Sequence, residues 1–202
     1  MQSTLALRLL RRFSPIFLAL GVLFTPALAA DAEIDIVLSL TALGPLPLGD
    51  GASVSEALLK KLFPSLKVTY EIGQGDSPDF HYFEVSSSKG EVLFSIQSFI
   101  EDPAPSTKTM AAVPIQLLQI YSRKIKDPYG LRVGDRAQDI IKKRGKALNF
   151  GAAHHDVFMG AGKIYYSLAT GRESSPEQFT MNDALKGNWK IHAITWPGAA
   201  WD

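Results

Sequence analysis

The strongest constraint on the fold is an order of elements that occurs twice along the chain, one helix followed by four strands. Runs of β-branched and aromatic residues bounded by turn residues indicate the strands. The helices are expected over 53–63 and 136–144, and the strands over 66–72, 80–86, 91–99, 115–122, 147–150, 155–158, 163–168 and 189–196. The pattern predicts an α+β fold in which two amphipathic helices cover one side of a mainly antiparallel sheet.

An internal duplication of residues 53–122 and 135–196 would explain this repeated order. The alternative is that a helix followed by a meander is simply a common unit, and few residues are identical between the halves. A further short strand is expected over 34–40, before the turn-rich segment 44–51. The sequence leaves the duplication open.

Capping residues mark the ends of the two helices. Ser53 and Glu56 have the spacing of a capping box, and Pro64 ends the first helix because it has no backbone N–H to donate. Asp135 is expected to cap the second helix, and Gly145 to end it in a left-handed conformation. The apolar faces are expected at Val54, Leu58, Leu62, Ala137, Ile140 and Ile141.

Two glycine-containing turns predict antiparallel hairpins. Lys89-Gly90 connects the second and third strands, and the third strand is expected to have one well-buried face because its residues alternate. Gly160-Ala161-Gly162-Lys163 is similar to the end of a phosphate loop. That motif also requires a glycine where Val157 stands and a hydroxyl residue where Ile164 stands, so we predict a hairpin turn.

Residues 1–30 have the pattern of a secretory signal peptide. Three arginines precede an apolar run over 16–24, and small residues follow up to Ala30. Cleavage after Ala29 or Ala30 is expected, which leaves 31–202 as a single domain that is periplasmic or secreted, soluble and without a transmembrane segment. An uncleaved anchor is the alternative. The absence of cysteine excludes disulfides, thiolate metal sites and a lipid-modified cysteine.

Charge is unevenly distributed along the expected mature chain. The leader holds three of the 21 basic residues and none of the 20 acidic ones, so removing it leaves a net charge of −2. Residues 31–114 carry a net charge of −7 and residues 115–202 a net charge of +5. This balance excludes a strongly cationic nucleic-acid binder. It suggests a contact between the positive half and an anionic partner.

The histidines offer the only candidate catalytic chemistry. His154 and His155 are adjacent, so on a strand they point to opposite faces and do not converge on one metal. His81 or His192 could add a ligand only if the fold brings it near. No nucleophile elbow or zinc-protease helix occurs in the sequence. We therefore predict no metal site, no cofactor and no catalytic residue.

Two segments carry a resemblance to a known family. They are Gly130-Leu131-Arg132-Val133-Gly134-Asp135, with the helix that follows, and the tryptophan-flanked closing strand within 185–196. They resemble a bacterial family of unknown function typified by the sigma-E-regulated outer-membrane lipoprotein. The resemblance implies an envelope protein but supplies no catalytic residues. Because this chain has no lipobox cysteine, membrane tethering does not carry over.

The function we predict is a non-catalytic binding or envelope-stress module that contacts an envelope component or a protein partner. The candidate contact is a basic segment that would bind anionic lipid, lipopolysaccharide or an acidic partner. Its residues are Arg123, Lys124, Lys126, Arg132, Lys142, Lys143, Arg144 and Lys146. The alternative is a periplasmic hydrolase that uses His81, His154 or His155 as an acid–base group. A scaffold for other envelope proteins is a third interpretation.

Overall fold

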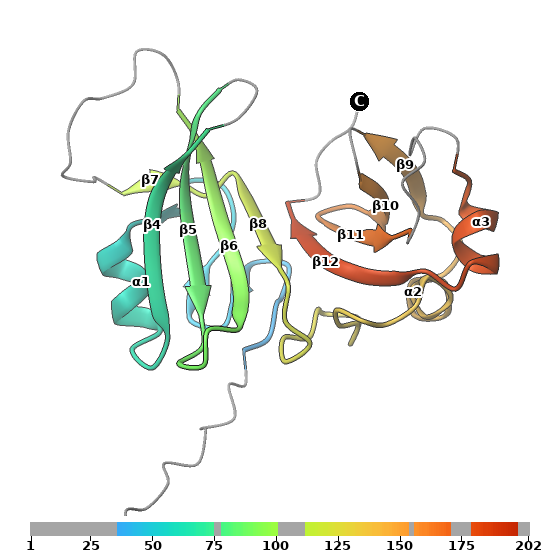
Figure 1. Cartoon of the computed structure of the whole chain (residues 1–202), viewed down its shortest axis with the longest axis horizontal. Coiled ribbons are helices and arrows are strands. Elements are labelled where there is room, and N and C mark those ends of the chain that lie inside the picture. The colour runs from blue at the N-terminus through green and yellow to red at the C-terminus, as the bar shows by residue number, and fades with distance from the viewer. Residues whose placement is uncertain (1–35, 75–77, 101–111, 154–155, 171–178, 198–202) are drawn as a thin grey trace, which may run out of the picture. The chain divides into compact units, whose positions relative to one another are not determined.

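An eight-stranded antiparallel sheet forms the centre of the protein (Figure 1). The computed structural model describes residues 36–74, 78–100, 112–153, 156–170 and 179–197. The strand order is β4-β5-β6-β8-β12-β11-β10-β9. The strands span β4 Lys67–Gly73, β5 Phe80–Ser86, β6 Val92–Phe99, β8 Leu117–Ile120, β9 Asn149–Ala153, β10 Asp156–Ala161, β11 Ile164–Ala169 and β12 Lys190–Trp196. The predicted mainly antiparallel α+β fold is confirmed.

The two halves of the sheet have mirrored strand orders. In each half a helix precedes the edge strand, and the later strands add toward the centre, where β8 pairs with β12. Ile194 of β12 lies opposite Ile120 of β8, and Ile120 also lies opposite Phe94 of β6. This order agrees with the repeated pattern in the sequence but does not by itself establish a duplication. Both predicted hairpins, β5–β6 and β10–β11, are present.

Helix α1 (Glu56–Leu62) begins two residues later than predicted. Its N-cap is Ser55, whose hydroxyl accepts a hydrogen bond from Leu58 N at 3.2 Å. Ser53 and Val54 instead form β3 (Ser53–Val54), which pairs with β7 (Val113–Pro114). The capping box at Ser53 was therefore wrong, because pairing with a distant strand fixes the Ser53 backbone as extended. The buried side chain of the helix is Leu59, whereas the predicted apolar face contained Leu58.

Helix α2 (Ala137–Arg144) is capped by Arg136, not by Asp135 as predicted. The Asp139 carboxylate accepts a hydrogen bond from Arg136 N at 2.9 Å, whereas the Asp135 carboxylate accepts from Arg132 N at 3.0 Å. Gly145 ends the helix with φ 83°, as expected of a residue without Cβ. Ala137 and Ile140 are buried, which confirms the expected apolar face.

Several short elements were not predicted. Helix α3 (Met181–Lys186) begins at Thr180, which forms a capping box with Asp183. The expected strand over 34–40 is reduced, in its described part, to single bridges from Val37 and Leu38. A small ribbon, β1 (Ala42–Leu43) with β2 (Leu46–Pro47), follows it. The prolines within 101–107 predict a loop there, but these residues and Trp201 lie outside the described residues.

The helices and the N-terminal segment pack on one face of the sheet, which we call the core face. Phe63 at the end of α1 packs edge-on against Phe94 of β6, with ring centroids 5.4 Å apart. Trp196 of β12 donates a hydrogen bond from its indole Nε1 to Leu40 O at 3.3 Å. Leu38, Leu43 and Leu46 are completely buried in the same cluster. None of the described helices is long and apolar enough to cross a membrane.

The opposite face of the sheet, which we call the open face, is covered by side chains of the strands themselves. Strand β6 shows this most clearly, because Leu93, Phe94, Ser95 and Ile96 are all completely buried. The prediction of a single buried face for this strand was therefore wrong. Adjacent strand residues point to opposite faces, so Ser95 lies on the open face and Phe94 and Ile96 lie on the core face.

Candidate functional site

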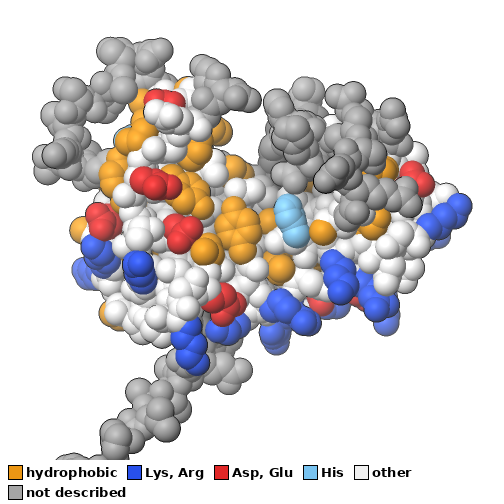
Figure 2. Space-filling model, in the orientation of Figure 1, with side chains coloured by type: hydrophobic (Ala, Val, Ile, Leu, Met, Phe, Trp, Pro, Cys, Tyr) orange, Lys and Arg blue, Asp and Glu red, His pale blue; other side chains and the backbone are white. Residues whose placement is uncertain are grey.

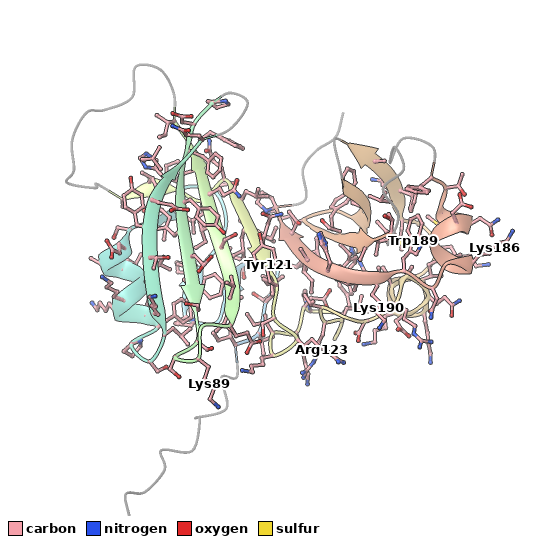
Figure 3. All side chains as sticks on the ribbon, viewed as in Figure 1. Lys89, Tyr121, Arg123, Lys186, Trp189 and Lys190 are labelled. Carbon is pink, nitrogen blue, oxygen red and sulfur yellow. The ribbon has the colours of Figure 1, made fainter. Side chains whose placement is uncertain are left out.

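The open face carries a row of polar and aromatic side chains that cross the first half of the sheet. Antiparallel register places Tyr82 of β5 between Glu71 of β4 and Gln97 of β6. Two residues farther along the strands, Ser95 lies between Glu84 and Gln119. Tyr121, just after β8, is on the same face as Gln119 (Figure 3). We call Tyr82, Ser95, Gln97, Gln119 and Tyr121 the open-face row.

Aromatic rings lie flat along the open face wherever a neighbouring strand has a glycine. Gly73 lies opposite Phe80, and the Phe80 ring occupies the space that a Cβ at Gly73 would need. Gly160 lies opposite Tyr165, and a Cβ at Gly160 would lie 2.7 Å from Cγ of that ring. Such cross-strand cover of glycine is a known device for stabilising a sheet. The rings that cover these glycines form an aromatic layer on the open face.

Hydroxyl contacts hold the tyrosines of the open-face row. The Tyr121 hydroxyl donates a hydrogen bond to Gln119 Oε1 at 3.0 Å and lies 3.3 Å from Ser95 Oγ. Ser95 also lies close enough to Tyr82 for its hydroxyl to lower the pKa of that tyrosine. Ser95 is diagonal to both tyrosines in the register. Ser95 is completely buried, whereas both tyrosines are half-buried.

The surroundings of Tyr82 are electrostatically negative. Burial raises the pKa of Tyr82 above its ordinary value; the hydrogen bond with Ser95 opposes this rise, and the carboxylates of Glu84 and Glu71 add to it. Figure 2 shows this face, where hydrophobic side chains gather over β5, β6 and β8 with acidic side chains among them. The open-face row can therefore offer ring faces, amides and negative charge to a ligand.

The structure gives half of the predicted basic segment intramolecular roles. Lys124 forms an ion pair with Glu91 at 2.7 Å, and Arg132 donates a hydrogen bond to the carbonyl oxygen of Arg123 at 3.0 Å. Lys143 donates from its ammonium group to the carbonyl oxygen of Gly130. Arg144 donates to the carbonyl oxygens of two residues at the β10–β11 turn. These four cations hold parts of the fold together.

The rest of the basic segment is exposed along one edge of the molecule. Arg123, Lys126, Lys142 and Lys146 are all exposed. Figure 2 shows Lys and Arg side chains along the lower edge of the view, where Figure 1 places the segment between β8 and α2. Figure 3 shows that Lys190 of β12 and Lys186 of α3 lie farther along the same side. The sequence hypothesis did not include these last two lysines.

A buried cluster on the core side connects the segment after β8 to the second half of the sheet. Asp127, only 3% exposed, accepts hydrogen bonds from Leu131 N at 2.7 Å and Tyr129 N at 2.9 Å. The Tyr166 hydroxyl donates to the same carboxylate. The Arg144 guanidinium carbon lies 4.2 Å from the Tyr129 ring centroid and 5.4 Å from that of Tyr166. We call Asp127, Tyr129, Arg144 and Tyr166 the buried cluster.

The described histidines do not form a catalytic arrangement. His81 Nδ1 lies 3.1 Å from the Tyr70 hydroxyl, the two rings stack, and burial lowers the pKa of His81. His192 is exposed on β12, and His154 and His155 lie outside the described residues. Within the described part of the chain, no group of three or more His, Cys, Asp or Glu side chains is placed to hold a metal ion.

A shallow depression beside α3 is lined by Asp183, Lys186, Gly187 and Trp189 (Figure 3). Asp183 already accepts hydrogen bonds from Thr180, so it serves as a helix cap. Trp189 is buried and packs edge-on against Phe179. This depression therefore belongs to the packing of α3.

Comparison with known proteins gives a fold and no activity. No protein-family model matches the chain, and no curated protein matches its sequence. The crystal structure of the uncharacterised protein YfeY from Escherichia coli is similar, with a TM-score of 0.55 and 17% sequence identity. The match covers 79% of this chain and 98% of YfeY. This protein therefore shares its fold with YfeY.

Proposed function

We propose that this protein is an exported, non-catalytic binding module of the bacterial envelope, and that it binds its partner through the open-face row. The observation that carries this proposal is a sheet face with half-buried tyrosines and amides over which no described helix packs. Tyrosine and serine together are effective in recognition, because tyrosine supplies a large, rigid and amphipathic contact area and serine supplies adaptable hydrogen bonds.

The layout of the open-face row, side by side across three neighbouring strands of one sheet face, favours a macromolecular partner. Sites for small molecules are concave and bury most of the ligand, whereas the described depression lies beside α3. A flat row of rings and amides is suited to a protein surface or to an extended chain. The hydrolase alternative gains no support, since His81 meets only the Tyr70 hydroxyl and aromatic rings among its described contacts.

The assignment to the envelope rests on the sequence. The signal-peptide pattern of residues 1–30 supports export to the periplasm or beyond. The resemblance of 130–135 and 185–196 to the sigma-E-regulated family supports the same compartment and a part in the envelope-stress response. We also propose that the halves 53–122 and 135–196 arose by duplication, because each contains a helix followed by four strands that add from the edge of the main sheet inward.

The exposed half of the basic segment is a second candidate contact, and we call it the basic edge (Arg123, Lys126, Lys142 and Lys146). Its exposed cations would attract anionic lipid or lipopolysaccharide, and that attraction would weaken as salt rises. Sedimentation with phosphatidylglycerol vesicles tests this contact. We expect more binding than to phosphatidylcholine vesicles at low salt, and reduced binding for a Lys126→Ala, Lys142→Ala, Lys146→Ala variant. Equal binding to both vesicle types would exclude it.

Crosslinking from defined positions tests the main proposal. A photoreactive residue replaces Gln97 or Gln119 on the open face, or Lys61 on the exposed side of α1 as the control, in the full chain within the cells that produce it. We expect a discrete adduct from both open-face positions and none from Lys61. Adducts from Lys61 alone, or none from any position, would contradict the proposal.

A further inference from the structure

The charges beside Tyr82 suggest which kind of partner the open-face row accepts. Glu71 lies directly across from Tyr82 on β4, and Glu84 lies two residues along β5 on the same face. Among the described residues, neither carboxylate forms an ion pair within 4.0 Å. Lys67 shares their face and is diagonal to Glu84 in the register, but it lies four residues from Glu71 along β4. The negative charge beside Tyr82 is therefore available to a partner.

The tyrosine rings beside these carboxylates also attract a positively charged group. The face of an aromatic ring is electron-rich, so it attracts a cation placed over it. Tyr82 is half-buried, so part of its ring is uncovered and available for stacking. A planar guanidinium suits such a ring better than an ammonium group does, because it stacks and can also donate hydrogen bonds to a carboxylate.

From this juxtaposition we infer that the open-face row binds an extended, arginine-bearing segment of a partner polypeptide. One guanidinium lies over the Tyr82 ring and donates to Glu84 or Glu71, and Gln97 and Gln119 bond the partner's backbone. The inference rests on the proposed function and specifies its partner. A glycan would also stack on flat rings and donate hydroxyl hydrogen bonds to the carboxylates, but it carries no positive charge to offset theirs. A guanidinium uses both features.

Titration of the purified protein with peptides, followed by amide NMR, tests the inference. The probe is an acetylated, amidated peptide of alternating arginine and glycine. Its control carries citrulline, which has nearly the same shape without the charge. We expect the arginine peptide to shift the signals of Tyr82, Glu84, Ser95 and Tyr121, and the citrulline peptide to shift none of them. The affinity should fall as salt rises.

Three variants locate the binding. Tyr82→Leu and the double change Glu71→Gln with Glu84→Gln should each weaken the arginine peptide about threefold to thirtyfold, the range expected for a cation–ring contact. Glu56→Gln on α1 is the matched control and should leave the affinity unchanged, since its ion pair with Lys60 is exposed on the helix. Amide spectra of all variants show whether each one is folded.

Several outcomes would overturn the inference. These are equal binding of the citrulline peptide, the same loss in Glu56→Gln, and binding of a muropeptide but not of the arginine peptide. If the protein self-associates and Glu84→Gln abolishes this self-association, the partner is a second copy of this chain. If crosslinks from Gln97 persist while the arginine peptide fails, the cationic partner is wrong and the binding surface stands. If neither Gln97 nor Gln119 gives a crosslink, the proposed function itself fails.

Discussion

Two tyrosine-centred clusters lie on opposite faces of the same sheet and differ in what their polar atoms do. In the buried cluster, Tyr166 is completely enclosed and its hydroxyl donates to Asp127, which also accepts two backbone N–H groups. In the open-face row, Tyr82 and Tyr121 are half-buried, and the Tyr121 hydroxyl lies 3.3 Å from Ser95 Oγ. Asp127 and Tyr166 of the first cluster are enclosed by the protein, although Tyr129 at its border is 38% exposed, whereas both tyrosines of the second keep part of their surface in solvent.

This difference separates a structural role from a binding role. Buried polar groups stabilise a fold only when they are hydrogen-bonded, and breaking such a set leaves unpaired groups in a medium of low dielectric constant. No buried side-chain nitrogen or oxygen among the described residues lacks a partner. We therefore expect changes in the buried cluster to lower stability, and changes in the open-face row to lower binding at nearly constant stability.

The largest effect is expected for Asp127→Ala. The change leaves the N–H groups of Tyr129 and Leu131 and the hydroxyl of Tyr166 without their acceptor, which should cost about 3 kcal/mol or more. Urea denaturation measures the loss, with the exposed Asp50→Ala as the control, expected within about 0.5 kcal/mol of the parent. An Asp127→Ala variant as stable as the control would remove the distinction between the two clusters.

Tyr166→Phe should come next and should depend on pH. Loss of a hydrogen bond to a charged group costs about 1.5–3 kcal/mol. Burial, with the neighbouring Asp127 adding to it, raises the pKa of Tyr166 above its ordinary value. A raised folded-state pKa means that the contribution is complete below pH ~10 and is lost as the pH rises further. The stability gap between parent and variant should therefore narrow from pH 8 to pH 11; a constant gap would contradict this account.

Arg144→Lys tests whether the guanidinium shape matters. Arg144 donates to the carbonyl oxygens of Ala161 and Ile164 at 2.7 and 2.8 Å and packs over two tyrosine rings. A lysine keeps the charge but cannot bridge both carbonyls while it stacks, so we expect a loss of about 1–2 kcal/mol. Lys142→Arg on the same helix should change the free energy of unfolding by less than about 0.5 kcal/mol. Equal effects would assign Arg144 to the exposed basic edge instead.

The smallest stability effect is expected in the open-face row. Tyr121→Phe removes a half-exposed hydroxyl that water can replace as a partner of Gln119, so the loss should stay below about 1 kcal/mol. Thermal unfolding of this variant beside Tyr166→Phe gives the contrast directly. If Tyr121→Phe is the more destabilising of the two, the open-face row is a structural element.

Sequence patterns predicted the strands because alternation and turn residues are local. Strand 80–86 was placed correctly, and Lys89-Gly90 and Gly162 form the expected hairpin turns. The helix starts were less accurate, because Ser53 and Ser55 are both good caps and the pairing of Ser53 with Pro114 decides between them. Helix α3 was missed although Thr180 and Asp183 have capping-box spacing.

The open-face row was not predicted, because it depends on register between strands that are far apart in the chain. Residues such as Ser95 and Gln119 become neighbours only when β6 pairs with β8. The available signal was the spacing of two between polar or aromatic residues in a strand, such as Tyr82 and Glu84, because this spacing places them on one face. Arg144 was predicted as part of a surface contact for a related reason, since the carbonyls and rings that it meets come from other elements.

The most direct test of the central claim is to measure crosslinking and stability in the same variants. Crosslinking from Gln97 in cells and the thermal midpoint of the purified protein are compared for Tyr82→Leu with Tyr121→Leu, and for Tyr166→Phe. The account predicts that the first variant loses the crosslinked partner with little change in midpoint, and that the second keeps the partner but melts several degrees lower. A partner yield that follows the midpoint in both variants would contradict it.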